Sequence, residues 1–350
     1  MTVERRELAP GYQISRLIRG GWQLAGGHGP VDRTQAIDDM AVFVDRGVTT
    51  FDCADIYTGA EEMIGEFRAR YEQERGKDAL RSLKVHTKFV PDWDRLPSLD
   101  RSYVEGIIDR SLRRLKADRL DLVQFHWWNY AAPGVVEAAL ILRDLQRAGK
   151  IDRIGGTNFD TPHTKAMIDA GVPLLSMQIQ YSLLDPRAEN GLVQLALTRG
   201  FGLLCYGTLA GGFLTNAWLG KPEPADGTLT NRGLIKYKLI IDDFGGWDLF
   251  QELLRTMDGI AQRHGVNIAA VAGRWMLDRP AVAGIIVGAR YADHLADDLK
   301  IFDFRLEGTD VAAIEQVLAK RHGPLGDTFE LERDRDGRHG RIMKYNLNAA

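Results

Sequence analysis

Residues 48–57 read VTTFDCADIY, a short apolar run that ends in the acidic residue Asp52. Valine, threonine and phenylalanine favour strands, because branched and aromatic side chains pack well on a pleated surface. The stretch RTQAIDDMAVFVDRG, which begins at Arg33 and precedes this run, has helical periodicity. A long helix beside a short buried strand is typical of the repeating unit of a parallel sheet.

The same alternation continues along the chain and gives eight strand-like runs. Helix-like stretches that begin at Arg101 and Pro133 are long enough for crossovers, and a proline suits a helix start. The glycine-rich segment GGWQLAGGHG does not spell the GxGxxG of an open doubly wound sheet. We therefore predict a single (β/α)8 TIM barrel. Its strands are expected near Leu17–Trp22 and in VTTFD ending at Asp52, LKVHTK at Lys88, DLVQFH at His126, IDRIGG at Gly156, LLSMQIQ at Gln180, FGLLCY at Tyr206 and AGIIVG at Gly288.

We expect the barrel to span residues 1–320. The segment from Lys221 to Gly246, which includes KPEPADG, forms an inserted loop after the seventh strand. It is expected to be a lid or substrate loop, with a solvated insertion as the alternative. Residues 321–350 form a C-terminal tail with the charged run ERDRDGRHGR. Its composition indicates a mobile segment, while the apolar end IMKYNL could dock on the barrel.

Composition narrows the class of protein. The chain has 45 basic and 48 acidic residues, for a net charge of -3 without a basic stripe, so nucleic acid is not an expected partner. No uncharged apolar run approaches the roughly 18 residues of a membrane span, and the start, MTVERRELAP, lacks a signal-peptide pattern. Cys53 and Cys205 are too few for a disulfide framework or a metal site. We expect a cytoplasmic protein without a metal.

Reactive polar residues stand where the expected strands end, and in a barrel those ends share one face. Taken singly, Asp52 could be a helix cap, Lys88 a surface charge and His126 a hydrogen-bonded core residue. Together they predict an active site. The residues are Asp52, Lys88, His126, Asn158, Gln178 and Tyr206.

The segments FDCADIY, VHTKF and QFHWW resemble those that carry the catalytic tetrad of the aldo-keto reductase family. Further similar segments are GGTNF from Gly155, MQIQYSLL from Met177, CYGTLAGGFL from Cys205 and GIIVGAR from Gly284, so the resemblance runs from about Gly11 to the last helix. It implies an NAD(P)-dependent oxidoreductase that interconverts an alcohol with an aldehyde, ketone or sugar carbonyl. The implied catalytic residues are Asp52, Tyr57, Lys88 and His126.

The chemistry explains why such residue types are needed. Hydride that reaches a carbonyl carbon leaves negative charge on oxygen, which a positioned donor must protonate. A free phenol has a pKa of about 10, so an ammonium such as Lys88 would favour the phenolate that Tyr57 leaves behind. Asp52 would pair with Lys88. His126 could orient the carbonyl or join a proton relay.

The resemblance also implies a nicotinamide site. Thr157, Asn158 and Gln178 would hold the carboxamide, and Tyr206 would stack on the ring. Gly207, Leu209 and Gly211 could offer the pyrophosphate backbone donors and room. Gly288, Ala289 and Arg290 would line the adenosine phosphate, where Arg290 could bind a 2′-phosphate and so favours NADPH over NADH. The chain departs from the family pattern at His294 and Asp298, where glutamine or arginine and asparagine are frequent.

Trp22 and Trp127 are expected to line the pocket of a small carbonyl substrate; packing of the barrel rim is the alternative.

Two other functions of the protein stay open. Some relatives of this fold are cofactor-sensing subunits of ion channels with little turnover. A Schiff-base barrel that uses Lys88 as nucleophile would leave Tyr57 and the cofactor segments unexplained.

Overall fold

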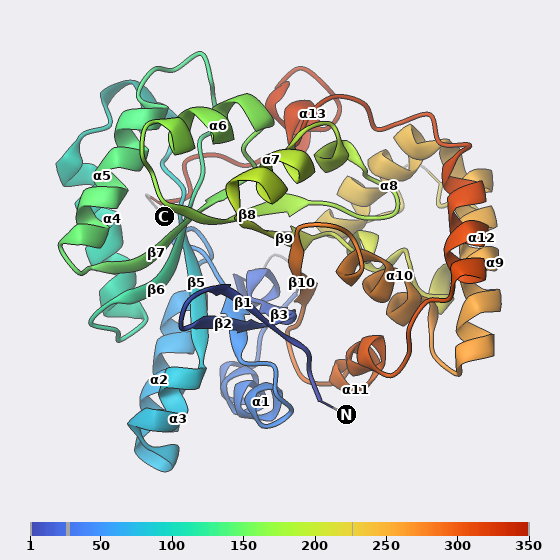
Figure 1. Cartoon of the computed structure of the whole chain (residues 1–350), viewed down its shortest axis with the longest axis horizontal. Coiled ribbons are helices and arrows are strands. Elements are labelled where there is room, and N and C mark those ends of the chain that lie inside the picture. Colours follow the sequence, from blue (N-terminus) through green and yellow to red (C-terminus); the bar gives the residue numbers. More distant parts are fainter. Residues whose placement is uncertain (1, 26–28, 226, 349–350) are drawn as a thin grey trace.

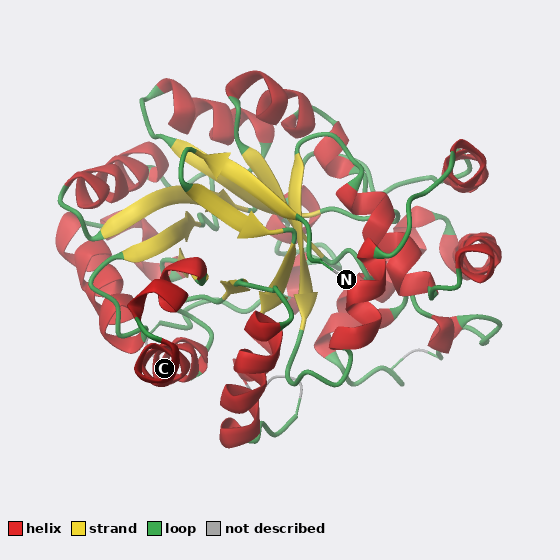
Figure 2. Cartoon of the chain, turned by 60° about the horizontal axis from the view of Figure 1, so that its bottom comes forward, coloured by secondary structure: helices red, strands yellow, loops and turns green. Residues whose placement is uncertain are grey.

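The computed structural model describes residues 2–25, 29–225 and 227–348. Eight parallel strands close into a barrel in the order β10-β3-β4-β5-β6-β7-β8-β9 (Figures 1 and 2). Each coincides with one of the eight expected runs, so the prediction of a (β/α)8 barrel is confirmed. The barrel strands are β3 (Leu17–Gly20), β4 (Thr50–Asp52), β5 (Lys84–Phe89), β6 (Leu120–Phe125), β7 (Ile151–Thr157), β8 (Leu174–Gln180), β9 (Gly202–Tyr206) and β10 (Val282–Gly288).

Helices surround the barrel (Figure 2). The helix expected from Pro133 begins two residues later, after Gly134 in a left-handed conformation. The α-helices are α1 (Arg33–Asp45), α2 (Ala60–Arg75), α3 (Lys77–Ser82), α4 (Arg101–Arg114), α5 (Val135–Arg147), α6 (Thr161–Asp169), α7 (Leu192–Arg199), α8 (Arg232–Phe244), α9 (Gly246–His264), α10 (Ile268–Leu277), α11 (Leu295–Asp298), α12 (Gly308–Leu318) and α13 (Glu330–Arg333).

An antiparallel hairpin, β1 (Arg5–Ala9) and β2 (Tyr12–Ser15), precedes the barrel and was not expected. Its side chains Tyr12 and Ile14 are buried with Ile18 and Leu122 from the barrel strands. The hairpin thus covers the amino-terminal ends of the strands and leaves the opposite end for a site.

The inserted segment 221–246 is only partly a loop. Its second half is α8, which begins after Asn231, whose side chain accepts hydrogen bonds from two backbone N–H groups of the first turn. Ile240, Ile241 and Phe244 of this helix are buried. The helical half is therefore packed on the protein.

The C-terminal tail also packs on the barrel, which differs from the mobile stretch that its composition indicates. In Figure 1 its red ribbon runs from α12 past α13 toward the carboxyl ends of the strands. Glu332 is 1% exposed and accepts hydrogen bonds from Arg187 at 2.9 and 3.1 Å. His339 contacts Asp243 of α8 at 2.7 Å. Several charges of the tail are therefore matched by partners elsewhere in the chain.

Candidate active site

An ion pair lies inside the barrel near the carboxyl ends of β4 and β5. Lys88 Nζ lies 2.7 Å from Asp52 Oδ2, and both side chains are 5% exposed. The ammonium also donates to the carbonyl oxygen of Cys53 at 2.8 Å. Burial alone would lower the pKa of Lys88, but the neighbouring acidic groups, with Asp52 first among them, together outweigh it and the pKa is raised. Lys88 is therefore a fixed positive charge near neutral pH.

Two glutamines complete the hydrogen bonding of Asp52. Its Oδ1 accepts from Gln124 Nε2 at 2.9 Å and from Gln178 Nε2 at 2.5 Å. Sequence reasoning missed Gln124, although it is a polar residue in a buried strand and pairs in register with Lys88. Gln178, expected at the cofactor, is only 4% exposed and bound to Asp52 here.

Tyr57 follows β4 and lies above this ion pair, with its ring centroid 5.0 Å from Lys88 Nζ. Its ring stacks on Trp22 with centroids 6.4 Å apart, and Trp22 is 38% exposed. Burial raises the pKa of the Tyr57 phenol, while the charge of Lys88 acts in the opposite direction. The phenol is thus protonated at neutral pH and beside a cation, as a proton donor requires.

His126 follows β6 and is 2% exposed. Its Nδ1 lies 3.0 Å from the carbonyl oxygen of Thr157, which can only accept, so Nδ1 carries the hydrogen. Burial, followed by the charge of Arg333, lowers the pKa of His126 to about 3, so the ring is neutral. Its Nε2 is then an acceptor, and it is buried without a partner among the residues that the structure describes. A buried acceptor of this kind costs about 1–3 kcal/mol until a donor reaches it.

The two tryptophans after His126 differ in position. Trp127 is fully buried, and its Nε1 donates to the carbonyl oxygen of Asn129 at 2.9 Å. Trp128 places its ring edge-on to His126 at 4.3 Å. Sequence reasoning named Trp127 and missed Trp128, although the two are adjacent in QFHWW.

The cofactor residues expected on β7 and β9 meet in the structure. The Tyr206 hydroxyl donates to Asn158 Oδ1 at 2.8 Å, and Asn158 adopts a left-handed backbone conformation with φ of 62°. Arg333 of the tail donates to the Asn158 carbonyl oxygen at 2.6 Å and to that of Trp128 at 2.9 Å. Arg333 therefore ties α13 to two sides of the site, a contact for which the local sequence gives no signal.

The turn after β9 contains Gly207, Leu209 and Gly211. The φ angles of Gly207 and Gly211 are 72° and 65°, in the left-handed region that glycine tolerates best. A Cβ at either position would lie within 3 Å of the Tyr237 ring or hydroxyl, so α8 packs closely on this turn. Thr208 in the same turn has a buried hydroxyl oxygen for which the described part of the chain provides no partner.

The remaining expected cofactor residues follow β10, which pairs with β3. Gly288 ends β10, Ala289 is buried, and Arg290 donates to the Pro30 carbonyl oxygen at 3.3 Å. His294 caps α11, and Asp298 ends it. Burial raises the pKa of Asp298 to about 7. These residues form a group apart from the ion pair, in line with an elongated ligand.

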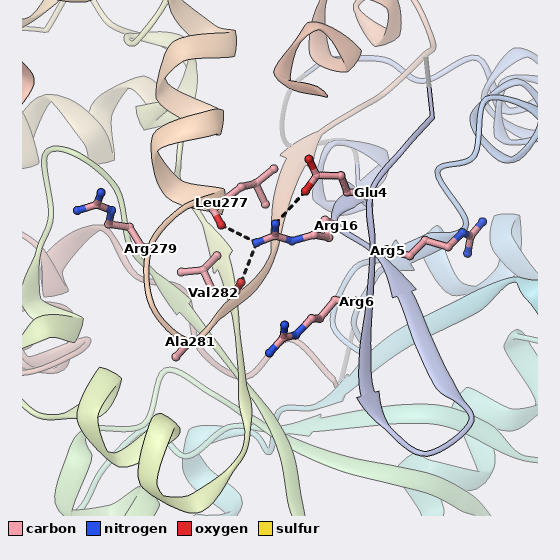
Figure 3. A pocket seen from close by; sticks show the side chains of 8 residues that line it. All are labelled: Glu4, Arg5, Arg6, Arg16, Leu277, Arg279, Ala281 and Val282. Carbon is pink, nitrogen blue, oxygen red and sulfur yellow. Dashed lines mark hydrogen bonds and ion pairs between the residues drawn. The ribbon is translucent and has the colours of Figure 1, made fainter. Parts of the chain in front are cut away.

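Figure 3 shows a separate pocket of about 400 Å³ at the amino-terminal end of the barrel. Arg16 is one of its lining residues. It donates to Glu4 at 3.0 Å and to the carbonyl oxygens of Leu277 and Val282 at 2.5 and 3.0 Å. These bonds join the hairpin to β10, so we assign the pocket a structural role.

Comparison with known proteins places the chain among oxidoreductases. Residues 16–319 match the model of the Aldo/keto reductase family. Aldo-keto reductase YhdN of Bacillus subtilis is 28% identical, over 91% of this chain and 95% of the relative. The NADH-specific methylglyoxal reductase of Escherichia coli is 24% identical, over 87% and 94%. A glycerol dehydrogenase structure from Gluconobacter oxydans, 23% identical, superposes with a TM-score of 0.73 over 93% of this chain and 98% of that structure.

Among the described residues, no helix is long and apolar enough to cross a bilayer.

Proposed function

The chain belongs to the aldo/keto reductase family and is an NAD(P)-dependent oxidoreductase, and we propose that Tyr57 is its proton donor in carbonyl reduction. The observation that carries this proposal is the buried pair of Lys88 and Asp52 directly beneath the Tyr57 ring. A role restricted to cofactor sensing finds no support among the relatives, several of which are named as reductases.

The residues present fit a nicotinamide cofactor. Tyr206 offers an aromatic face beside Asn158, and no group within residues 2–25, 29–225 and 227–348 binds the Thr208 hydroxyl in the glycine turn after β9. We propose that Thr157, Asn158, Gln178 and Tyr206 hold the nicotinamide end; Gly207, Leu209 and Gly211 the pyrophosphate; and Gly288, Ala289, Arg290, His294 and Asp298 the adenosine end. The bound cofactor supplies the hydride.

The protein groups manage the proton. Negative charge that develops on the substrate oxygen is neutralised by the Tyr57 hydroxyl, and the phenolate left behind is stabilised by Lys88. Asp52 and its two glutamine donors fix the ammonium, so little reorganisation is needed during transfer. His126 Nε2 has no hydrogen to donate to a carbonyl. We propose that it accepts a hydrogen bond from the product hydroxyl or from a relay water.

Three finer assignments are also proposals. Arg290 supports NADPH over NADH, because a guanidinium suits a 2′-phosphate; one relative is nevertheless named as NADH-specific. We propose a cytoplasmic location, on the sequence features given above. We also propose that residues 1–320 form the barrel and residues 321–350 a tail that closes one side of the site, because Arg333 contacts the segment after β6 and Asn158.

The test is Tyr57→Phe, which removes only the hydroxyl. The purified protein is incubated with NADPH or NADH and a panel of aldehydes and ketones that includes methylglyoxal and L-glyceraldehyde 3-phosphate, for which two relatives are named. We expect kcat to fall roughly 10²- to 10⁴-fold, the usual contribution of general acid catalysis. Cofactor affinity, followed by fluorescence, should stay near the parent value.

Tyr71→Phe is the matched control, because Tyr71 packs on Phe67 of the same helix α2, away from the ion pair. It should retain the parent rate. A Tyr57→Phe protein that reduces carbonyls at the parent rate contradicts the mechanism. A parent protein that binds cofactor and turns over no member of the panel would favour the sensor function instead.

A further inference from the structure

Lys236 is a buried cation that the mechanism does not use. It lies in the second turn of α8 and is 7% exposed. The neighbours of its Nζ are aromatic: the ring centroids of Tyr206, Tyr237 and Phe329 lie at 5.1, 5.6 and 5.9 Å. Aromatic faces attract a cation but satisfy none of its three N–H donors.

The nearby carboxylates are engaged by another cation. Glu332 Oε1 is 3.9 Å from Lys236 Nζ, which is beyond hydrogen-bonding distance. Arg187 donates to both oxygens of Glu332, and also to both oxygens of Asp185 at 2.9 and 2.7 Å. Within the part of the chain that the structure describes, Lys236 thus has one long ion-pair contact and no hydrogen bond. An ammonium in this state is stabilised by acceptors that water or a bound molecule supplies.

Lys236 lies near His126, one of the proposed catalytic residues. A single ring, that of Phe329, separates it from His126, since Phe329 lies edge-on to His126 with centroids 5.6 Å apart. The glycine turn after β9, proposed for the pyrophosphate, is covered by the Tyr237 ring. Lys236 is therefore placed to reach a group a few bonds away from a carbonyl held at Tyr57.

We propose that Lys236 binds an anionic group, a carboxylate or a phosphate, on the carbonyl substrate. The inference rests on the proposed function, and it narrows the substrate class to small aldehydes or ketones that carry a negative charge. Burial lowers the pKa of Lys236, with Glu332 acting in the opposite direction. An incoming anion would add charge-assisted hydrogen bonds to a side chain that is only 7% exposed, and burial strengthens such bonds.

The experiment compares charged substrates with neutral counterparts. Succinic semialdehyde and its methyl ester test the carboxylate, and glyceraldehyde 3-phosphate and glyceraldehyde test the phosphate. The measured quantity is the ratio of kcat/KM between the charged and the neutral member of each pair. For Lys236→Met we expect this ratio to fall about 10- to 100-fold in at least one pair, as the loss of a charge-assisted hydrogen bond implies. The pair affected distinguishes a carboxylate from a phosphate.

Lys238→Met is the matched control. It removes the same charge from the same helix. Because Lys238 pairs with Asp242 and Glu223, the ratio of kcat/KM between charged and neutral substrates should not change. Because removal of Lys236 leaves the cluster with Arg187, Asp185 and Glu332 at a net charge of -1, Lys236→Met could fold poorly. The double variant Lys236→Met with Glu332→Gln keeps the cluster neutral and should show the same fall in ratio.

Binding without turnover separates this inference from the proposed function. Calorimetry with succinate and with glycerol 3-phosphate should show affinity for the wild type that Lys236→Met weakens, even if no aldehyde is reduced. Active variants whose ratios match the wild type would overturn the inference and leave the reductase function intact. A loss of NADPH affinity in Lys236→Met with unchanged ratios would also overturn it, because Lys236 would then bind the cofactor pyrophosphate.

Discussion

We predict that the free energy of unfolding depends on pH through a buried histidine on a barrel strand. His86 is fully buried on β5, and neither ring nitrogen has a partner in the structure. Burial, followed by the charges of Lys88 and Lys84, lowers the pKa of His86 to about 3. In the unfolded chain the pKa is about 6.5. Below pH 6.5 the unfolded state therefore binds a proton that the folded state does not, and stability falls as pH falls toward 3.

The size of the effect follows from these two pKa values. One proton taken up only by the unfolded state costs about 1.4 kcal/mol per pH unit, so His86 should cost about 2 kcal/mol between pH 7 and pH 5. His86→Leu removes this contribution. The difference in unfolding free energy between the two pH values, from urea titrations, should thus be about 2 kcal/mol smaller in the variant than in the wild type.

A difference between two proteins is needed because other groups titrate in the same window. The carboxylates and His126 contribute alike to wild type and variant and cancel. His322→Gln, at an exposed position, is the control and should follow the wild type. Parallel pH profiles for wild type and His86→Leu would refute the reasoning, since they would mean that folded His86 takes up a proton as readily as the unfolded chain.

Two further predictions concern the cofactor. Arg290→Ala should weaken NADPH binding by about 1.5–3 kcal/mol and leave NADH binding nearly unchanged, measured by fluorescence titration; equal losses for both cofactors would argue against a 2′-phosphate contact. Shortening residues 221–231 of the insertion should speed cofactor release in stopped-flow experiments, because the insertion follows the glycine turn after β9 that we propose for the pyrophosphate. Unchanged release rates would show that the segment is not a lid.

The barrel was predictable because its strands obey a local rule. Each is a short run of branched and apolar residues between helix-length segments, and burial on both faces requires such runs. The hairpin β1–β2 escaped the rule. Its first strand, RRELA, exposes Arg5, Arg6 and Glu7 and buries no large side chain, so it carries no apolar pattern. The strand is stabilised through its partner β2, whose Tyr12 and Ile14 pack against side chains at the amino-terminal end of the barrel.

The site divides in the same way. Asp52, Tyr57, Lys88 and His126 lie in segments whose order along the chain matches a family pattern, so the sequence indicates them directly. Gln124 lies inside one of those segments and was missed, because a polar residue among apolar ones does not reveal which face of its strand it occupies. The register does, since it places Gln124 beside Lys88. The alternation of side chains along β6 places Gln124 on the same face as His126. The pairing of Gln124 with Lys88 also requires the register between β5 and β6.

The tail and α8 were beyond local reasoning for a physical reason. The run ERDRDGRHGR would be mobile if its charges faced water, yet Glu332 pairs with Arg187, which is 145 residues earlier in the chain. Whether a charge is solvated or buried depends on a partner that composition cannot locate. Arg187 also binds Asp185, and Glu332, which Arg187 engages through both oxygens, lies 3.9 Å from Lys236 Nζ. The unused donors of Lys236 thus follow from the folding of the tail, and the substrate preference we propose for this enzyme depends on a segment that its sequence alone would assign to solvent.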